Sequence, residues 1–202
     1  MNPRIARLLS IVLHPVLFPT YAIFFIFEDR TFLAFTTPPS EKYALYTIII
    51  LNTLLLPLLI SYMLVNRGMI RSFEMEKREE RIVPFLSNAF LLVVSYYLMR
   101  RFALPIVFQL LILGAAASVV LTVIINFKWK ISIHMVGIGG VIGAFFGLST
   151  FLLVDLRIPI LFCLLIAGLL GSARLTVGSH SPMQIYAGFV VGFFCEYLIL
   201  SL

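Results

Sequence analysis

The sequence predicts an all-α protein, a polytopic transmembrane helix bundle, on the strength of two observations. Of its 202 residues, 61% are hydrophobic and 12% are charged, whereas soluble domains are roughly half apolar and about a quarter charged. The apolar residues also gather into runs of the length that a bilayer core requires, about 20 residues per helix. Isolated strands cannot satisfy their backbone hydrogen bonds in lipid, so we expect these runs to be helical.

Seven apolar segments have the length of a membrane-spanning helix. We expect a single integral membrane domain over residues 1–202, with a six-helix core at 43–201 and an N-terminal apolar segment at 1–30. That first segment is not expected to cross simply, because His14-Pro15 and Pro19 interrupt the hydrogen-bond ladder of a helix. The seven segments cover residues 9–27, 43–65, 82–99, 103–126, 131–154, 158–176 and 183–201.

The net charge of +6 does not indicate a nucleic-acid partner, because the basic residues lie in short loops between apolar runs, as juxtamembrane residues do. We therefore expect membrane lipids as the surroundings, and the sequence leaves the oligomeric state open. Arg4 and Arg7 resemble the start of a signal peptide, but no small-residue cleavage motif follows, so we expect the segment to be retained. Glycines spaced four apart at 139, 143 and 147, with Gly188 and Gly192, favour close helix packing.

Three polar stretches interrupt the apolar background, at residues 71–84, 128–134 and 174–184. Each stretch is separated from the next by two spans. A chain that crosses the membrane twice returns to the face from which it started. We therefore expect all three stretches to lie on one face of the membrane, and this is the strongest functional signal in the sequence.

The third stretch places Arg174 six residues before His180. An arginine offers a planar fork of donors for phosphate oxygens, and a histidine can act as a nucleophile or a proton carrier. The second stretch places Ser132 two residues before His134, at the start of a span. The alternatives are interfacial residues for the first pair, and for the second a serine N-cap followed by a buried histidine, with Trp129 as an interface anchor.

The first stretch mixes Lys77, Arg78 and Arg81 with four glutamates. It is either a solvated surface of charges paired at helical spacing, such as Glu74 with Arg78, or a cation cluster directed at phosphate. The sequence favours neither interpretation.

Taken in order, the stretches resemble the type 2 phosphatidic acid phosphatase superfamily, whose motifs run Lys-x6-Arg-Pro, Pro-Ser-Gly-His and Ser-Arg-x5-His-x3-Asp. The resemblance covers roughly residues 71–192. In the third motif Arg174, His180 and Gln184 match in spacing. In the second, Ser132 and His134 match, while isoleucines replace the proline and the glycine. The first motif is matched only loosely, by Lys77, Arg78, Arg81 and Pro84.

The resemblance implies a six-helix core, a site that uses no metal and no cofactor, and hydrolysis of a lipid phosphate or lipid pyrophosphate through a phosphohistidine. His180 would attack phosphorus, and His134 would protonate the departing oxygen. In the family an aspartate orients the nucleophilic histidine, and Gln184 stands in its place without a charge. The phosphoryl oxygens would be held by Arg174, Ser132, Lys77, Arg78 and Arg81.

Gln184 also has a simpler interpretation. Ser181-Pro182-Met183-Gln184 has the pattern of a capping box, with Ser181 as the N-cap and proline at the first helical position. His14 is expected to matter much less to the chemistry than His180.

Two further hypotheses stay beside the phosphatase: a catalytically impaired relative that binds lipid head groups or serves as an assembly subunit, and a small transporter. His14 and Glu196 within apolar segments favour the transporter.

We expect an integral protein of the bacterial inner membrane. On the strength of the resemblance we expect its site on the extracytoplasmic face, although the excess of basic residues beside the polar stretches favours the cytoplasm. The sequence does not identify the lipid.

Overall fold

A computed structural model describes residues 1–28, 32–75 and 77–202, and all regular structure in these ranges is helical. The chain begins with α1 (Pro3–Val12), a 3₁₀ turn η1 (Pro15–Leu17), α2 (Phe18–Glu28) and α3 (Phe32–Thr36). It continues with α4 (Pro39–Ile49), a π-helical turn η2 (Ile50–Leu55), α5 (Leu56–Asn66), a 3₁₀ turn η3 (Glu79–Arg81) and α6 (Ile82–Arg101). The last four helices are α7 (Ile106–Asn126), α8 (Ile133–Phe151), α9 (Arg157–Thr176) and α10 (Pro182–Ser201).

Within the described ranges, seven helical segments are long and apolar enough to cross a membrane. Each overlaps one of the seven segments that the apolar runs predict, and the all-α transmembrane bundle is thereby confirmed. The protein is an integral membrane protein. The seven segments are Pro3–Phe27, Pro39–Asn66, Glu79–Arg101, Ile106–Asn126, Ile133–Phe151, Arg157–Thr176 and Pro182–Ser201.

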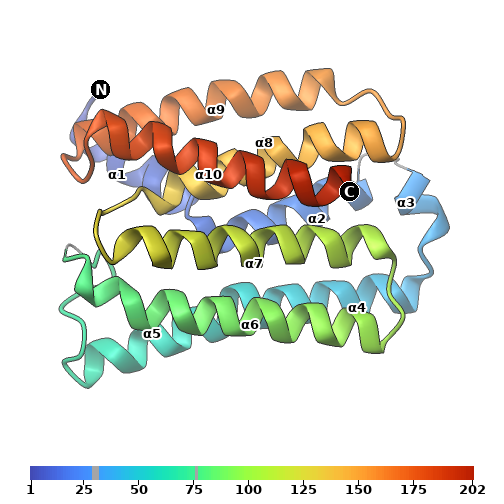
Figure 1. Cartoon of the computed structure of the whole chain (residues 1–202), viewed down its shortest axis with the longest axis horizontal. Coiled ribbons are helices and arrows are strands. Elements are labelled where there is room, and N and C mark those ends of the chain that lie inside the picture. Colours follow the sequence, from blue (N-terminus) through green and yellow to red (C-terminus); the bar gives the residue numbers. More distant parts are fainter. Residues whose placement is uncertain (29–31, 76) are drawn as a thin grey trace.

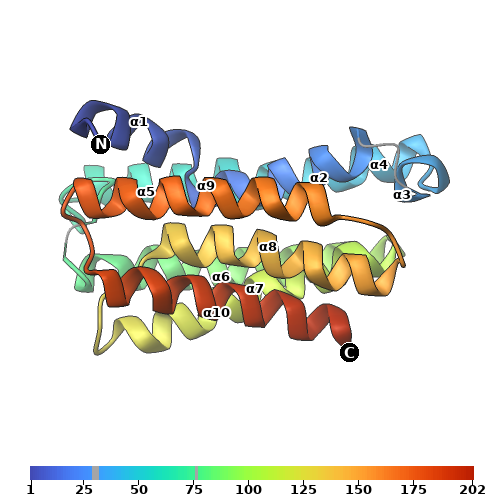
Figure 2. The ribbon, with the colours of Figure 1, turned by 90° about the horizontal axis from the view of Figure 1, so that it is seen from above.

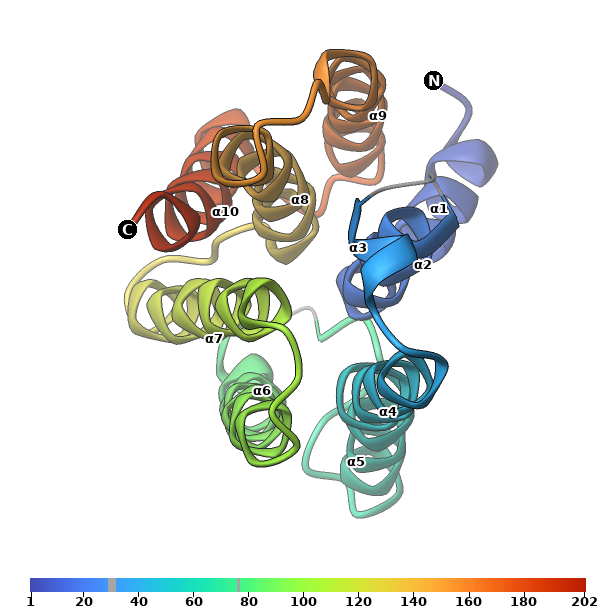
Figure 3. The ribbon, with the colours of Figure 1, turned by 90° about the vertical axis from the view of Figure 1, so that its right-hand side faces the viewer.

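The helices run back and forth along the bundle, so the connections alternate between its two ends (Figures 1 and 2). The N-terminus and the connections α5 to α6, α7 to α8 and α9 to α10 lie at one end, which we call the polar end. The C-terminus and the connections α6 to α7 and α8 to α9 lie at the other. All three polar stretches therefore share one end, as the crossing count predicts. Viewed along its length, the bundle has α2, α4, α6, α7 and α8 around its centre (Figure 3).

The N-terminal segment is broken where the prolines predict it. α1 ends at Val12, η1 follows from Pro15, and α2 starts at Phe18. The broken segment nevertheless extends from the polar end along the bundle, and it is one of the seven candidate spans (Figure 2). The segment is therefore long and apolar enough to cross the membrane as two offset helices.

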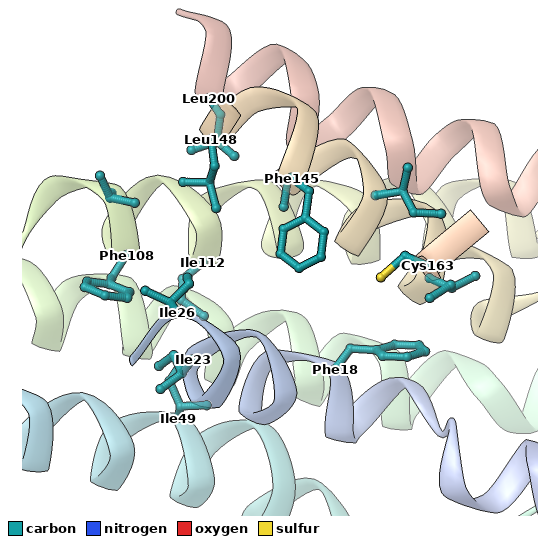
Figure 4. Packing of buried hydrophobic residues seen from close by; sticks show 14 of the residues in the cluster. Phe18, Ile23, Ile26, Ile49, Phe108, Ile112, Phe145, Leu148, Cys163 and Leu200 are labelled. Atoms are coloured by element: carbon teal, nitrogen blue, oxygen red, sulfur yellow. The ribbon is translucent and has the colours of Figure 1, made fainter. Parts of the chain in front are cut away.

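The core joins the N-terminal segment to the other helices. Ile23 and Ile26 of α2 lie near Phe108 and Ile112 of α7, and Phe145 of α8 projects toward the same region (Figure 4). The outer surfaces instead expose large apolar side chains, among them Phe90, which is 67% exposed. Large apolar side chains on the outside are the reverse of the arrangement in soluble proteins, and a lipid environment stabilises them.

The predicted glycine positions bring α8 and α10 together. A Cβ atom at Gly139 or Gly143 would collide with the backbone of Phe189 or Phe193 on α10, and one at Gly192 would collide with the carbonyl of Val136. The missing side chains let the two backbones touch. This packing fixes the start of α10 beside the start of α8, and so the third polar stretch beside the second.

Candidate functional site

A cavity of about 820 Å³ extends from the polar end into the bundle. All three histidines of the chain line it. Its deeper wall is mainly apolar and includes Ile23, Leu92, Met99, Phe108 and Ile112. Its polar part is lined by His14, His134, His180, Arg81, Lys130 and Arg174. One compartment thus combines basic and imidazole groups with an apolar extension.

A glycine turn places His180 in this cavity. Gly178 follows α9 with a φ of 70°, in the left-handed region. Its N–H donates to Leu175 O at 2.9 Å, and Ser179 N donates to Arg174 O at 3.3 Å. This is the hydrogen-bond pattern of a Schellman motif, in which glycine ends a helix and reverses the chain. The turn therefore directs His180 back toward Arg174, the residue whose carbonyl closes the motif.

Gln184 holds the ring of His180 in one orientation. Its Oε1 accepts from Ser181 N at 3.0 Å, so this atom is the amide oxygen and not the nitrogen. The same Oε1 lies 3.2 Å from His180 Nδ1, which must then carry a proton and donate it. The neutral ring consequently has its lone pair at Nε2. That atom is buried and has no hydrogen-bond partner among the described residues.

The environment of His180 keeps its ring uncharged near neutral pH. Burial lowers the pKa of His180 to about 3, and the positive charges of Arg81, Arg174 and Lys130 act in the same direction. The hydrogen bond to Gln184 acts the other way and raises the pKa. An uncharged imidazole is the form that can act as a nucleophile.

His134 has the opposite orientation. Its Nε2 lies 3.0 Å from Ser10 O in α1, and a carbonyl can only accept, so Nε2 carries the proton. Its Nδ1 is buried without a partner among the described residues. The side chain is 6% exposed, at the start of α8. His134 is therefore free to exchange a proton through Nδ1, whereas His180 presents Nε2.

Two arginines complete the polar part of the cavity. Arg81 is 4% exposed, and its guanidinium donates to Met75 O at 2.9 Å and to Ile131 O at 3.3 Å. It thus ties the first polar stretch to the second. The Nε of Arg174 is buried with no partner in the described part of the chain. An unpaired buried guanidinium donor indicates a place where an anion would be bound.

Three predicted phosphate ligands do not reach the cavity wall. Lys77 is exposed. Arg78 is also exposed, and it donates to Glu79 at 2.8 Å and to Lys128 O at 2.9 Å. Ser132 is fully buried, and its hydroxyl has no hydrogen-bond partner among the residues that the structure describes, while its backbone N donates to Gln184 O at 3.3 Å. Of the two interpretations of the first stretch, the paired surface fits Arg78 and the cation site fits Arg81.

The cavity also contains residues that spacing did not place there. His14 lies with its ring edge-to-face on His134, at a centroid distance of 5.3 Å. Lys130 and Glu74 line the polar part, and Glu196 of α10 lines the wall with its Oε2 buried and unpartnered among the described residues. The sequence marks His14 and Glu196 in one way only: each is an ionisable residue within an apolar segment.

Among the residues that the structure describes, no group of three or more His, Cys, Asp or Glu side chains could hold a metal ion. Comparison of the chain with protein-family models, with curated proteins and with solved structures finds no match. The chemistry of this cavity is therefore the basis on which a function can be inferred.

Proposed function

We propose that the protein is a membrane-embedded phosphatase that hydrolyses a lipid phosphate or lipid pyrophosphate through a phosphohistidine. The single observation that carries the proposal is the orientation of His180 in a cavity lined by Arg81 and Arg174. Its Nδ1 is hydrogen-bonded to Gln184, while its Nε2 has no partner in the described part of the chain. A fixed, uncharged nucleophile beside fixed cations is what phosphoryl transfer requires, because the transferred group carries negative charge throughout.

In the first step Nε2 of His180 forms a bond to phosphorus as the bond from phosphorus to the lipid oxygen breaks. His134 takes a proton at its unprotonated Nδ1 from the phosphate monoanion of the substrate and gives it to the departing oxygen. That oxygen leaves as the lipid alcohol, or as the lipid monophosphate when the substrate is a pyrophosphate. Arg174 and Arg81 bind the phosphoryl oxygens. The N–H at Nδ1 of His180 stays hydrogen-bonded to Gln184, which holds the ring in line with phosphorus.

In the second step water attacks phosphorus and breaks its bond to Nε2 of His180. His134 takes the proton of that water at Nδ1 and passes it to the inorganic phosphate, which is released. Both histidines have then returned to their starting states. The cycle consumes one water and yields one inorganic phosphate together with one lipid alcohol, or one lipid monophosphate when the substrate is a pyrophosphate.

The apolar extension of the cavity supports a lipid as the substrate. Side chains of α2, α6 and α7 form this wall, among them Ile23, Leu92 and Ile112. A hydrocarbon chain that enters it would leave its phosphate among the basic groups at the polar end. The burial of apolar surface would then hold the substrate.

A second candidate function is a small transporter, which Glu196 favours. A carboxyl group that faces a cavity inside a bundle is a common element of ion and proton pathways. Glu196 is 7% exposed, and its Oε2 has no partner among the described residues.

Phosphate release from the purified protein tests the proposal. The parent protein, His180→Asn and Glu196→Gln are incubated in detergent with phosphatidate and with a polyprenyl pyrophosphate. We expect turnover by the parent, none by His180→Asn, and turnover near the parent rate by Glu196→Gln. A phosphatase is contradicted if the parent releases no phosphate, or if His180→Asn is as active as the parent. Tight lipid binding without turnover would instead identify a head-group binder.

A further inference from the structure

The ring of His134 depends on a carbonyl that a regular helix would not offer. Inside an α-helix, Ser10 O would accept from the N–H four residues later, which is that of His14. Here His14 N donates to Ile11 O at 3.2 Å instead. Ser10 O is left to accept from Nε2 of His134, 124 residues away in the sequence.

The cause of this exchange is Pro15. A regular helix would pair Ile11 O with the N–H of residue 15, but proline has none. Ile11 O is thus open to His14 N, and Ser10 O is released from the helix ladder. The turn that follows is held by His14 itself, whose Nδ1 accepts from Val16 N at 3.4 Å. One proline therefore converts a helix carbonyl into a hydrogen-bond acceptor in the cavity.

The packing of α8 fits this arrangement. Gly137 lies three residues after His134, and so on the same face of α8. A Cβ atom at Gly137 would lie 2.5 Å from the ring of Phe18 and 3.2 Å from the side chain of Pro15. The absence of a side chain at residue 137 lets the broken segment approach α8. The ring of His14 packs against His134 at the same place.

We propose that the break in the N-terminal segment is a positioning device for His134, in which Pro15 frees Ser10 O to fix the tautomer of the ring. Pro15 and Ser10 are positioning residues, because they act through His134 and not on a substrate. The device makes Nε2 the protonated nitrogen and reserves Nδ1 for proton exchange. The kinetic consequence rests on the proposed phosphatase, whereas the tautomer does not.

The test is the ¹⁵N spectrum of histidine-labelled full-length protein in detergent, recorded for the parent, Pro15→Ala and Pro39→Ala. The chain has three histidines, so substitution of each in turn assigns the signals. Pro39→Ala is the matched control, since Pro39 is the first residue of α4, where a helix N–H has no partner in any case. We expect a protonated Nε2 for His134 in the parent and in Pro39→Ala. In Pro15→Ala the new N–H restores the ladder, so the two tautomers of His134 should become mixed.

In the kinetic part of the test, Pro15→Ala should lower kcat by about tenfold or more, with little change in KM. General acid–base catalysis contributes about 10²- to 10⁴-fold to a rate, and a mixed tautomer of His134 should lose part of that contribution. If the variant does not fold, Gly137→Ala tests the same contact, with Gly168→Ala as its control because no atom lies within 4 Å of a Cβ there. A His134 spectrum that is unchanged in a folded Pro15→Ala or Gly137→Ala overturns the inference. A parent that releases no phosphate refutes the phosphatase alone, because the spectrum still tests the positioning of His134.

Discussion

His180 and Gln184 are joined by a 3.2 Å hydrogen bond from Nδ1 to Oε1, and the same oxygen accepts from Ser181 N at the start of α10. The sequence presents two alternative roles for Gln184, a helix cap and a residue that orients the histidine. One amide oxygen of Gln184 performs both. The helix fixes the amide, and the amide fixes the ring. The orientation of the proposed nucleophile is therefore coupled to the N-terminus of α10.

The double role of Gln184 predicts that its substitutions separate stability from turnover. Gln184→Ala should lose about 1 kcal/mol of stability, the usual size of a capping effect. It should also lower turnover, because the His180 ring is no longer held. Gln184→Glu keeps the length of the side chain and adds a charge that stabilises a positively charged ring, so turnover should rise by about tenfold, or 1.4 kcal/mol in barrier. Phosphate release and thermal unfolding measure the two effects, and an unchanged rate in both variants would leave Gln184 as a cap alone.

The different positions of Arg81 and Arg78 predict different kinetic effects. Arg81→Lys removes the planar fork that bonds Met75 O and faces the cavity, so kcat/KM should fall by about tenfold or more. Arg78→Lys is the matched control, because Arg78 is exposed and its pair with Glu79 is a surface contact of small energy. We expect it to stay within about twofold of the parent, since a surface pair contributes little. Equal losses in the two variants would contradict the assignment of Arg81.

The lowered pKa of His180 predicts a loss of stability in acid. The folded protein holds this ring with a pKa of about 3, against 6.5 for an ordinary histidine. Between these two values the unfolded chain binds a proton that the folded chain does not, so the free energy of unfolding falls as the pH falls. The contribution is about 2 kcal/mol between pH 7 and pH 5. Thermal unfolding in phosphate-free buffer should show a smaller pH dependence for His180→Asn than for the parent, and identical pH dependences would refute the shift.

The turn after α9 predicts a contrast between two glycines. Gly178→Ala places a side chain at a φ of 70°, which costs about 1–2 kcal/mol and disturbs the turn that places His180. Gly168 lies within α9, and a Cβ atom there would meet open space, so Gly168→Ala should improve helix propensity by about 1 kcal/mol. We therefore expect one variant to be destabilised and slow, and the other to be stable and active. Thermal unfolding and phosphate release compare them, and a fully active Gly178→Ala would contradict the proposed role of the turn.

The shared polar end predicts a common accessibility of the three loops. Single cysteines replacing Ser72, Trp129 and Ser179, in a background without Cys163 and Cys195, should react as a group with an impermeant thiol reagent. The N-terminal segment is long and apolar enough to cross, and Lys77 and Arg78 do not line the cavity. The charges of Lys77 and Arg78 therefore count among the basic residues of this end. That excess favours the cytoplasmic side, so we expect labelling after lysis only. Labelling in intact cells would instead support the extracytoplasmic site that the family resemblance implies.

The fold was largely predictable because the properties that determine it are local. The length and the apolar composition of each run are sufficient to predict a spanning helix, and parity of crossings is sufficient to bring the three polar stretches to one end. The break at Pro15 was equally predictable, since proline interrupts a helix wherever it occurs. Arg174, His180 and His134, which the spacing of the motifs singles out, all line the cavity, and such spacing is itself a local property.

What the sequence alone determined, then, is a membrane bundle with a polar end that carries histidines and arginines. Only the tertiary structure decided that Arg81 faces the cavity while Lys77 and Arg78 do not, and that Ser10 and His14 of the N-terminal segment meet His134. These outcomes depend on how far each helix is rotated about its axis and how closely it approaches its neighbours. Glycines at the contacts of α8 with α10 and with the broken segment set those distances. A contact between residues 10 and 134 therefore has no signature in the sequence, because the rotations of two separate helices must combine to create it.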